Sequence, residues 1–309
     1  MKIIKYISEI KNIVKKEKIS GKTIGLVPTM GYLHEGHLSL IRSSVRDNEV
    51  TIVSVFVNPT QFGPNEDYNR YPRDLEKDAQ HAENTGADIL FAPSVEEMYP
   101  DGYRTYINVE GITEVLCGRS RPGHFKGVAT VVAKLFNITE ADRAYFGLKD
   151  AQQFVAVKKM VEDLNMNIEI IPCPIIREAD GLAMSSRNAY LSLEEREAAL
   201  VLSHSLFEAE AMVKKGERDI SHLLESIKRR ISLEKLASVE YIEAVNADTL
   251  ENIYKIEDKT KETAKSEINE MTKSEIKEEI KSRNREKVLV ALAIKIGTTR
   301  LIDNIIVEV

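Results

Sequence analysis

The feature that most constrains the fold is an alternation, in the first half of the chain, of short apolar runs with longer amphipathic stretches. The runs "TIGLVPT" (23–29), "VTIVSVFVNP" (50–59) and "ADILFAP" (87–93) are rich in β-branched or apolar residues, which is typical of strands buried on both faces. Residues 36–48 and 73–85, which lie between successive runs, carry helix-like patterns. This order predicts a parallel sheet with right-handed crossovers, a doubly wound α/β fold.

The alternation continues up to about residue 176. We expect a helix over 125–137, a strand at "RAYFG" (143–147), a helix over 149–163 and a strand at "IEIIPCPII" (168–176). The sequence therefore predicts a first domain over residues 1–176.

The remaining residues, 177–309, follow a different pattern. Helices are expected over 194–215 and 219–231, and strands at "VEYIEAV" and "KVLVALAIKI". These elements indicate a smaller α+β C-terminal domain.

Between those two strands lies a charged insertion at about 255–287, built almost entirely from Lys, Glu, Ser and Thr. Its few apolar residues cannot form a core. Ile268, Ile276 and Ile280 recur at multiples of four, so both a solvated helical arm and disorder fit the pattern. We expect an exposed insertion without a catalytic role.

The composition bounds the function. With 43 basic and 49 acidic residues the formal net charge is -6, which argues against a broad nucleic-acid-binding surface. Cys117 and Cys173 are too few for a disulfide framework and fit a reducing compartment. The amphipathic N-terminus lacks an apolar stretch long enough for a signal peptide or a membrane span. We therefore expect a cytoplasmic protein without a membrane or nucleic-acid partner.

The stretch "VPTMGYLHEGHLSL" (27–40) places His34 and His37 in a strand-to-helix turn. The spacing is not that of the HExxH zinc motif, and a polar, glycine-flanked turn is a poor place for core histidines. A phosphate site is a third reading, because helix N-termini at the ends of parallel strands bind anions. Gly31 and Gly36 would let a base or a phosphate approach the backbone, and both imidazoles could donate hydrogen bonds to phosphate oxygens.

Two further turns carry polar residues. "AMSSRN" (183–188) offers the Ser185 and Ser186 hydroxyls and the Arg187 guanidinium to a phosphate, although a Ser-Ser pair also caps a turn. "FGLKDAQQF" (146–154) opens a helix after a strand. A second set of candidates there comprises Gly147, Lys149, Asp150 and Gln153, for which a solvated helix start is the alternative.

The polar loop 57–78 follows the central strand, and long structured loops at strand ends tend to be functional. Asn58 and Gln61 are candidates for holding hydroxyls and a carboxylate, while Tyr71 and Arg73 would shape the mouth of a cleft. Another basic cluster precedes an apolar helix, and it reads equally as an anion-facing helix N-terminus or as a simple cap. It consists of Arg121, His124 and Lys126.

The H-x-G-H turn resembles the HIGH signature of the nucleotidyltransferase and class I aminoacyl-tRNA synthetase superfamily. The 183–188 loop resembles its KMSKS loop, with Ala183 at the first lysine position and Arg187 near the second. In their order along the chain, these motifs together resemble the pantoate–β-alanine ligase family. The resemblance covers residues 1–254 and 287–309, and 255–287 departs from it by being longer and more charged.

The resemblance implies a Rossmann-like domain with a smaller C-terminal lid, and a typically homodimeric enzyme. ATP and pantoate would give bound pantoyl adenylate and pyrophosphate, with Mg²⁺. The amine of β-alanine would then attack the adenylate and release AMP and pantothenate. The sequence does not show which side chains, if any, would ligate Mg²⁺.

The resemblance also implies residue roles. His37 matches the proton donor, with His34 beside it on the phosphates and with Lys149 and Arg187 completing the catalytic set. Gln61 matches the glutamine shared by pantoate and β-alanine, next to Asn58, and Gln153 matches the second pantoate glutamine. The implied ATP site comprises Pro28, Thr29, Met30, Gly31, His34, Gly36, His37, Gly147, Leu148, Lys149, Asp150, Ile176, Met184, Ser185, Ser186 and Arg187.

Three other functions share some of these motifs. A nucleotidyl transfer enzyme acting on a phosphorylated small molecule is one, and an aminoacyl-tRNA synthetase is another. The acidic balance and the lack of an evident anticodon-binding domain count against the synthetase. A nucleotide-binding regulator without turnover is the third, and the presence of His34, His37, Lys149 and Arg187 counts against it.

Overall fold

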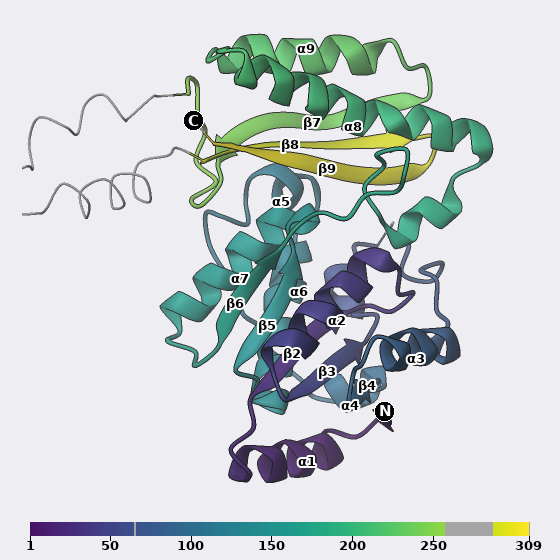
Figure 1. Ribbon diagram of the computed structural model, residues 1–309, viewed down its shortest axis with the longest axis vertical. Coiled ribbons are helices and arrows are strands. Elements are labelled where there is room, and N and C mark those ends of the chain that lie inside the picture. Colours follow the sequence, from purple (N-terminus) through teal and green to yellow (C-terminus); the bar gives the residue numbers. More distant parts are fainter. Residues whose placement is uncertain (65, 257–286, 309) are drawn as a thin grey trace, which may run out of the picture. The chain divides into compact units, whose positions relative to one another are not determined.

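The computed structural model describes residues 1–64, 66–256 and 287–308 (Figure 1). The chain divides into two compact units, Met1–Ser192 and Leu193–Val309. The division falls later than the boundary expected after residue 176. The intervening segment contacts the first unit: Ser186 Oγ donates to the Tyr32 carbonyl at 3.3 Å, and Arg187 forms an ion pair with Asp67.

The first unit is built on a six-stranded parallel sheet, which confirms the predicted doubly wound α/β fold (Figure 1). The strand order is β1-β4-β3-β2-β5-β6. The chain thus winds outward from β2 to β3 and β4, then returns to place β5 on the other side of β2. Ligands bind at the carboxyl ends of strands where the winding reverses in this way. The strands are β1 (Lys2–Ile4), β2 (Ile24–Thr29), β3 (Val50–Val55), β4 (Ile89–Phe91), β5 (Arg143–Gly147) and β6 (Glu169–Cys173).

Helices cover both faces of this sheet, and side chains alternate between the two cores with the strand period of two. Ile24 and Leu26 of β2 join one core with α1, α6 and α7, whereas Val27 joins the other with α2 and α3. The α-helices are α1 (Ile7–Ile19), α2 (Glu35–Asp47), α3 (Leu75–Asn84), α4 (Val95–Met98), α5 (Leu116–Ser120), α6 (His124–Thr139) and α7 (Ala151–Asp163). Three 3₁₀ turns complete the unit: η1 (Pro59–Gln61), η2 (Leu148–Asp150) and η3 (Ser186–Tyr190).

The second unit is a smaller α+β structure, as predicted. Its antiparallel sheet has the order β7-β8-β9, with β7 (Ala237–Asn246), β8 (Lys287–Ile296) and β9 (Thr299–Glu308). Helices α8 (Leu193–Lys214) and α9 (Ile220–Ser232) pack against each other, and both contact the sheet. The sequence patterns did not predict β1 or β9.

The charged insertion predicted at about 255–287 lies almost entirely outside the described residues. The chain on either side of it is anchored. Ile256 is 1% exposed and its N–H donates to the Arg218 carbonyl at 3.1 Å. The Ala247 N–H donates to the Lys287 carbonyl at 2.9 Å.

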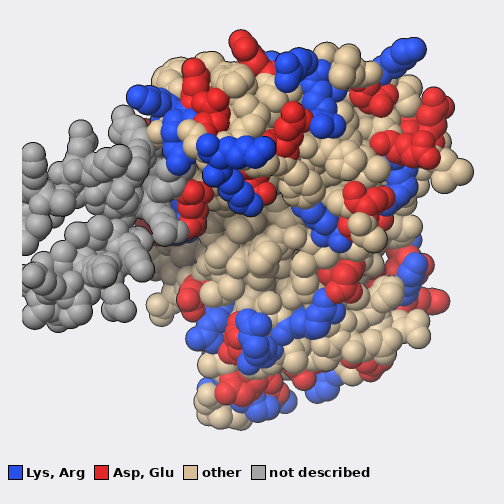
Figure 2. All heavy atoms as spheres, turned by 45° about the horizontal axis from the view of Figure 1, so that its top comes forward, with Lys and Arg blue, Asp and Glu red and all other residues tan. Residues whose placement is uncertain are grey.

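The surface carries charges of both signs, interspersed on the face drawn in Figure 2, as expected from nearly equal numbers of basic and acidic residues. Across the part of the chain that is described, every helix is too short or too polar to cross a membrane.

Candidate active site

A cavity of about 210 Å³ opens in the first unit, lined by the segments that follow β2, β3, β5 and β6. It brings together most of the residues singled out from the sequence, including Tyr71, Arg121 and His124. Gly31 and Leu148 belong to the same turns but not to its described lining. The predicted ligand contacts that line it are Pro28, Thr29, Met30, His34, Gly36, His37, Asn58, Gln61, Gly147, Lys149, Asp150, Gln153, Ile176, Met184, Ser185, Ser186 and Arg187.

The two histidines lie at the N-terminus of α2. His34 is the N-cap residue, with extended backbone, and its N–H donates to His37 Nδ1 at 3.3 Å. The two ring centroids are 4.0 Å apart. Because His37 Nδ1 accepts this bond, a neutral His37 carries its proton on Nε2. His34 Nδ1 is buried without a hydrogen-bond partner among the described residues.

Both imidazoles are neutral in the free protein. Burial, followed by the charge of Lys149, lowers the pKa of His34 to about 4. Burial also holds the pKa of His37 well below 6.5, with His34 and Lys149 adding to the effect. Each neutral ring has one N–H donor and one acceptor nitrogen. Because the acceptor of His37 already takes the His34 N–H, His37 offers a ligand only its Nε2–H.

The glycines of this turn make room for protein atoms. A Cβ on Gly36 would lie 2.9 Å from His34 Nδ1, and one on Gly31 would lie 2.8 Å from Asp78 Oδ2. Gly31 also has a φ of +83°, which favours glycine. The sequence predicts that these glycines let a base or a phosphate approach the backbone. The contacts show another reason for glycine: a side chain at either position would collide with His34 or Asp78.

Asp78 of α3 supports the same turn and was not predicted. It is 2% exposed and accepts hydrogen bonds from the Tyr32 and Leu33 N–H groups at 2.9 and 2.7 Å. Burial raises the pKa of Asp78, although these two backbone bonds oppose the rise. The signal in the sequence was a carboxylate on the buried side of the amphipathic stretch 73–85.

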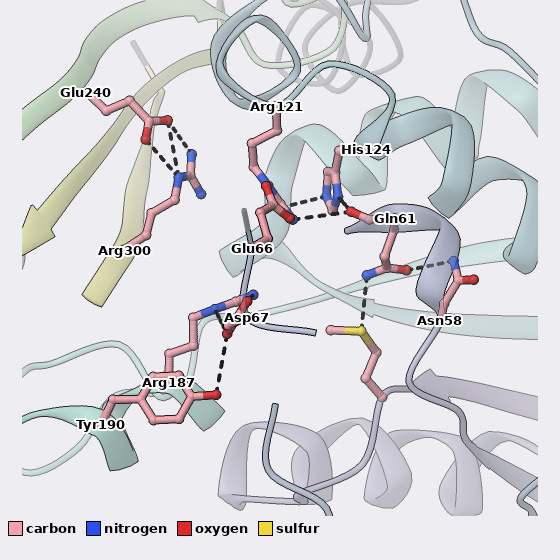
Figure 3. Close-up of polar contacts among 11 residues, drawn as sticks. Asn58, Gln61, Glu66, Asp67, Arg121, His124, Arg187, Tyr190, Glu240 and Arg300 are labelled. Carbon is pink, nitrogen blue, oxygen red and sulfur yellow. Dashed lines mark hydrogen bonds and ion pairs between the residues drawn. The ribbon is translucent and has the colours of Figure 1, made fainter. Parts of the chain in front are cut away.

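Gln61, the last residue of η1, is held by Asn58, which caps η1, and by Met30, which follows β2. Its Oε1 accepts from Asn58 Nδ2 at 3.1 Å, and its Nε2 lies 3.1 Å from Met30 Sδ (Figure 3). Asn58 is 1% exposed and also donates to the Gly127 carbonyl. Asn58 therefore orients Gln61, and its Nδ2 hydrogens are already used within the protein.

Arg121 and His124 form a second support for Gln61 (Figure 3). Glu66 accepts two bonds from the Arg121 guanidinium, at 2.7 and 2.5 Å. Arg121 Nη1 lies 3.0 Å from His124 Nε2, and because arginine only donates, His124 Nδ1–H donates to the Gln61 carbonyl at 2.8 Å. Arg121 and His124 thus line the cleft while hydrogen bonds to Glu66 and Gln61 fix them in place. Lys126 lies elsewhere, with its ammonium 4.9 Å from the Tyr106 ring centroid.

The pKa values of His124 and Glu66 are both strongly lowered. Burial, together with the smaller effect of the Arg121 charge, lowers the pKa of His124 to about 3. Burial would raise the pKa of Glu66, but its bonds to Arg121 outweigh burial and bring the pKa to about 2. At neutral pH the support consists of a Glu66–Arg121 ion pair and a neutral imidazole.

The 184–187 loop packs on the histidine turn. Ser185 Oγ accepts from the Arg187 N–H at 3.3 Å, so it caps η3 as the alternative reading of the sequence expected. Arg187 Nε and Nη2 donate to the two carboxylate oxygens of Asp67 at 3.0 and 2.9 Å (Figure 3). On the turn after β5, Lys149 Nζ lies 3.6 Å from Asp150 Oδ2.

A parallel α/β unit with histidine, lysine, arginine and glutamine side chains converging at its strand ends defines a Rossmann-like ligand-binding enzyme. The family model described as "Pantoate-beta-alanine ligase" matches residues 2–306. The chain belongs to the pantoate–β-alanine ligase family. It is a ligase that forms the amide bond of pantothenate, as the sequence motifs predicted.

The curated relatives to which the chain is similar are pantothenate synthetases. The chain is 60% identical over 309 residues to the pantothenate synthetase of Acetivibrio thermocellus, covering 100% of both chains. It is 55% identical to that of Caldicellulosiruptor saccharolyticus, again covering 100% of both.

Solved structures agree. The pantothenate synthetase of Thermus thermophilus matches with a TM-score of 0.85 and 39% identity over 99% of each chain. The pantoate–β-alanine ligase of Francisella tularensis, described as complexed with beta-gamma ATP and β-alanine, matches with a TM-score of 0.72 and 34% identity. That match covers 99% of this chain and 97% of the other.

Proposed function

We propose that the cleft of the first unit carries out both steps of pantothenate formation. The pantoate carboxylate attacks the α-phosphorus of ATP, which gives bound pantoyl adenylate and releases pyrophosphate. The amine of β-alanine then attacks the acyl carbon, and AMP leaves. The observation that carries this proposal is that one cavity gathers the His34–His37 pair, Lys149, Arg187 and Gln61.

The histidines act on the triphosphate. His37 Nε2–H points a donor at the developing charge without carrying a charge of its own in the free protein. Arrival of the anionic triphosphate opposes the effect of Lys149 and raises both histidine pKa values. His37 is then ready to give a proton to the departing pyrophosphate, and donors placed in advance are what stabilise such charge.

Of the remaining residues, one group binds ATP and the other binds pantoate and β-alanine. Lys149 and Arg187 neutralise phosphate charge. Ser185 and Ser186 hold phosphate oxygens, and the Ser186 hydroxyl exchanges the Tyr32 carbonyl for one of them. The rest of the nucleotide lies against the backbone of the 28–31 and 147–150 turns, Ile176 and Met184. Gln61 and Gln153 bind pantoate, with Gln61 also meeting β-alanine, and Asn58 orients Gln61. The Francisella tularensis relative, described as complexed with beta-gamma ATP and β-alanine, supports a site that takes a nucleotide and β-alanine.

Mg²⁺ accompanies ATP in this proposal. Within the described residues there is no group of three or more His, Cys, Asp or Glu side chains that could hold a metal alone. Asp150 is the one carboxylate in the described lining of the cleft, and one carboxylate plus phosphate oxygens is a usual Mg²⁺ environment. Asp150 therefore fits the ion, which would neutralise phosphate charge when bound.

We also propose that the enzyme is a cytoplasmic homodimer, on the basis of its family. Sedimentation at micromolar concentration tests the dimer, and a monomer at all concentrations would refute it.

Isotope exchange tests the two-step reaction. Pantoate, ATP and Mg²⁺ without β-alanine should support exchange of labelled pyrophosphate into ATP. With β-alanine, AMP and pantothenate should appear in equal amounts. A strict requirement of exchange for β-alanine would refute a separate adenylation step, and formation of ADP would refute adenylation altogether.

A further inference from the structure

Loop 57–78 holds the arginine of the 184–187 loop through Asp67. The Asp67 and Arg187 side chains, 120 positions apart in sequence, form two nearly equal hydrogen bonds between a carboxylate and one edge of a guanidinium. Their side chains are 14% and 26% exposed, so water screens the pair only in part. A bidentate pair of this kind fixes the plane of the guanidinium as well as its position.

Other groups complete the orientation. Tyr190 Oη lies 3.4 Å from Asp67 Oδ2 (Figure 3). It also lies 3.1 Å from the Arg70 carbonyl. The Arg187 guanidinium carbon lies 5.7 Å from the centroid of the buried Tyr71 ring. Asp67, at the edge of the guanidinium, and Tyr71, at its face, thus restrict its orientation.

The pair uses only part of the guanidinium. Its hydrogen bonds to the described protein run through Nε and Nη2, whereas Arg187 also lines the cleft. Nη1 can therefore serve a ligand while the Asp67 bonds persist. A lysine ammonium donates all three of its hydrogens from one freely rotating nitrogen, so it has no separate, fixed edges for Asp67 and for a ligand, which gives a physical reason for arginine in this loop.

We propose that Asp67 is a positioning residue for adenylation. It sets the plane of Arg187 so that the Nη1 edge meets the triphosphate, and it ties the loop that bears Gln61 to the loop that binds phosphate. This inference rests on the proposed role of Arg187 in ATP binding.

The opposite role is also testable. A carboxylate can compete with a phosphate for the same guanidinium, in which case Asp67 would hold Arg187 away from ATP. Removing the Asp67 charge would then strengthen ATP binding, whereas it weakens adenylation if Asp67 positions Arg187.

The experiment is a double-mutant cycle with Asp67→Asn, Arg187→Ala and the double variant. Each is assayed by pyrophosphate exchange for the first step and by β-alanine attack on supplied pantoyl adenylate for the second. We expect Asp67→Asn to lower kcat/KM for ATP about 10- to 100-fold, mainly through kcat, because a misaligned donor loses transition-state stabilisation. The second step should change by less than about threefold, and the Asn substitution should have no further effect in the Arg187→Ala background.

Asp142→Asn is the matched control. Asp142 Oδ1 pairs with Lys18 Nζ at 2.6 Å and Oδ2 accepts from the Ile24 N–H at 2.7 Å, at the amino end of β2. This variant loses the same charge from an ion pair at the other end of the sheet. It should keep wild-type kcat/KM even if its melting temperature falls as much as that of Asp67→Asn.

The other possible outcomes distinguish the proposed role of Arg187 in ATP binding from the proposed positioning role of Asp67. An active Arg187→Ala enzyme would refute the role of Arg187 and this inference with it. If Arg187→Ala is impaired but Asp67→Asn is unchanged or binds ATP more tightly, only the positioning role is overturned. Equal losses from Asp67→Asn with and without Arg187, or in both steps, would likewise overturn it.

Discussion

Gly127→Ala should damage the enzyme by moving η1. Gly127 lies in α6 where the helix passes directly over this turn. A Cβ there would lie 2.4 Å from the Thr60 carbonyl oxygen, 2.5 Å from its carbon and 2.6 Å from the Gln61 nitrogen. All three are backbone atoms, so no side-chain rotation relieves the clash.

The size of the effect follows from these distances. Ordinary contacts begin at 3.4 Å, so η1 must move by about 1 Å. A shift of this size in a positioning element lowers rates by about 100-fold. Overpacking costs about 1–3 kcal/mol, and alanine recovers about 1 kcal/mol in a helix interior, which leaves a loss in stability of up to about 2 kcal/mol.

Steady-state kinetics and urea unfolding measure both quantities. Because Gln61 lies on η1, the KM values for pantoate and β-alanine should rise while that for ATP changes little. Gly63→Ala is the control, since the nearest atom to a Cβ at Gly63 is Glu66 at 3.7 Å, an ordinary contact. A Gly127→Ala enzyme with wild-type kinetics would show that Gln61 does not depend on this packing.

Three further predictions concern the charges of the cleft. His37→Ala should fold normally yet lower pyrophosphate exchange about 10²- to 10³-fold, and His34→Ala should be less damaging. In both variants the attack of β-alanine on supplied adenylate should be largely unchanged. Equal damage to both steps would argue against a role of the histidines at the phosphates. The pKa of His124 is about 3 in the folded protein and 6.5 in the unfolded chain, so between these values the unfolded chain binds one more proton. The free energy of unfolding should therefore fall as the pH drops from about 6.5 towards 3. His124 contributes up to about 1.4 kcal/mol per pH unit to this fall. Denaturant unfolding against pH checks this, because His124→Gln should flatten the slope, and an unchanged slope would contradict a neutral His124. Asp150→Asn should raise the Mg²⁺ concentration needed for half-maximal exchange several-fold, and an unchanged Mg²⁺ dependence would remove Asp150 from the ion.

The elements that the sequence predicted are those with a long, regular pattern. The strand at 287–296 and the helix near 125–137 were placed within a few residues because their apolar runs are continuous. β1 has only three residues, too few to show a period. β9 places Asp303 and Asn304, 2% and 4% exposed, inside the sheet and so breaks the apolar pattern of a strand.

The candidate site divides in the same way. Residues carried by a continuous turn, such as His34, His37 and Lys149, were found from the turn itself, and their chemical roles stay predictions. The carboxylates that hold the histidine turn, Arg121 and Arg187 were missed. Glu66, Asp67 and Asp78 reach partners 55, 120 and 45 positions away, and no local pattern encodes such contacts.

The anchoring of Ile256 and Lys287 has a consequence for how this gene can vary. Ile256 and Lys287 are secured to the second unit by their own contacts. A flexible linker engineered between these two positions would cost about 0.6 kcal/mol for each doubling of its length, less than many single substitutions. Insertions and deletions at this point should therefore drift almost neutrally among lineages. The same tolerance makes the position between Ile256 and Lys287 suitable for inserting a reporter domain, because the contacts of these two residues do not depend on the length of the chain that connects them.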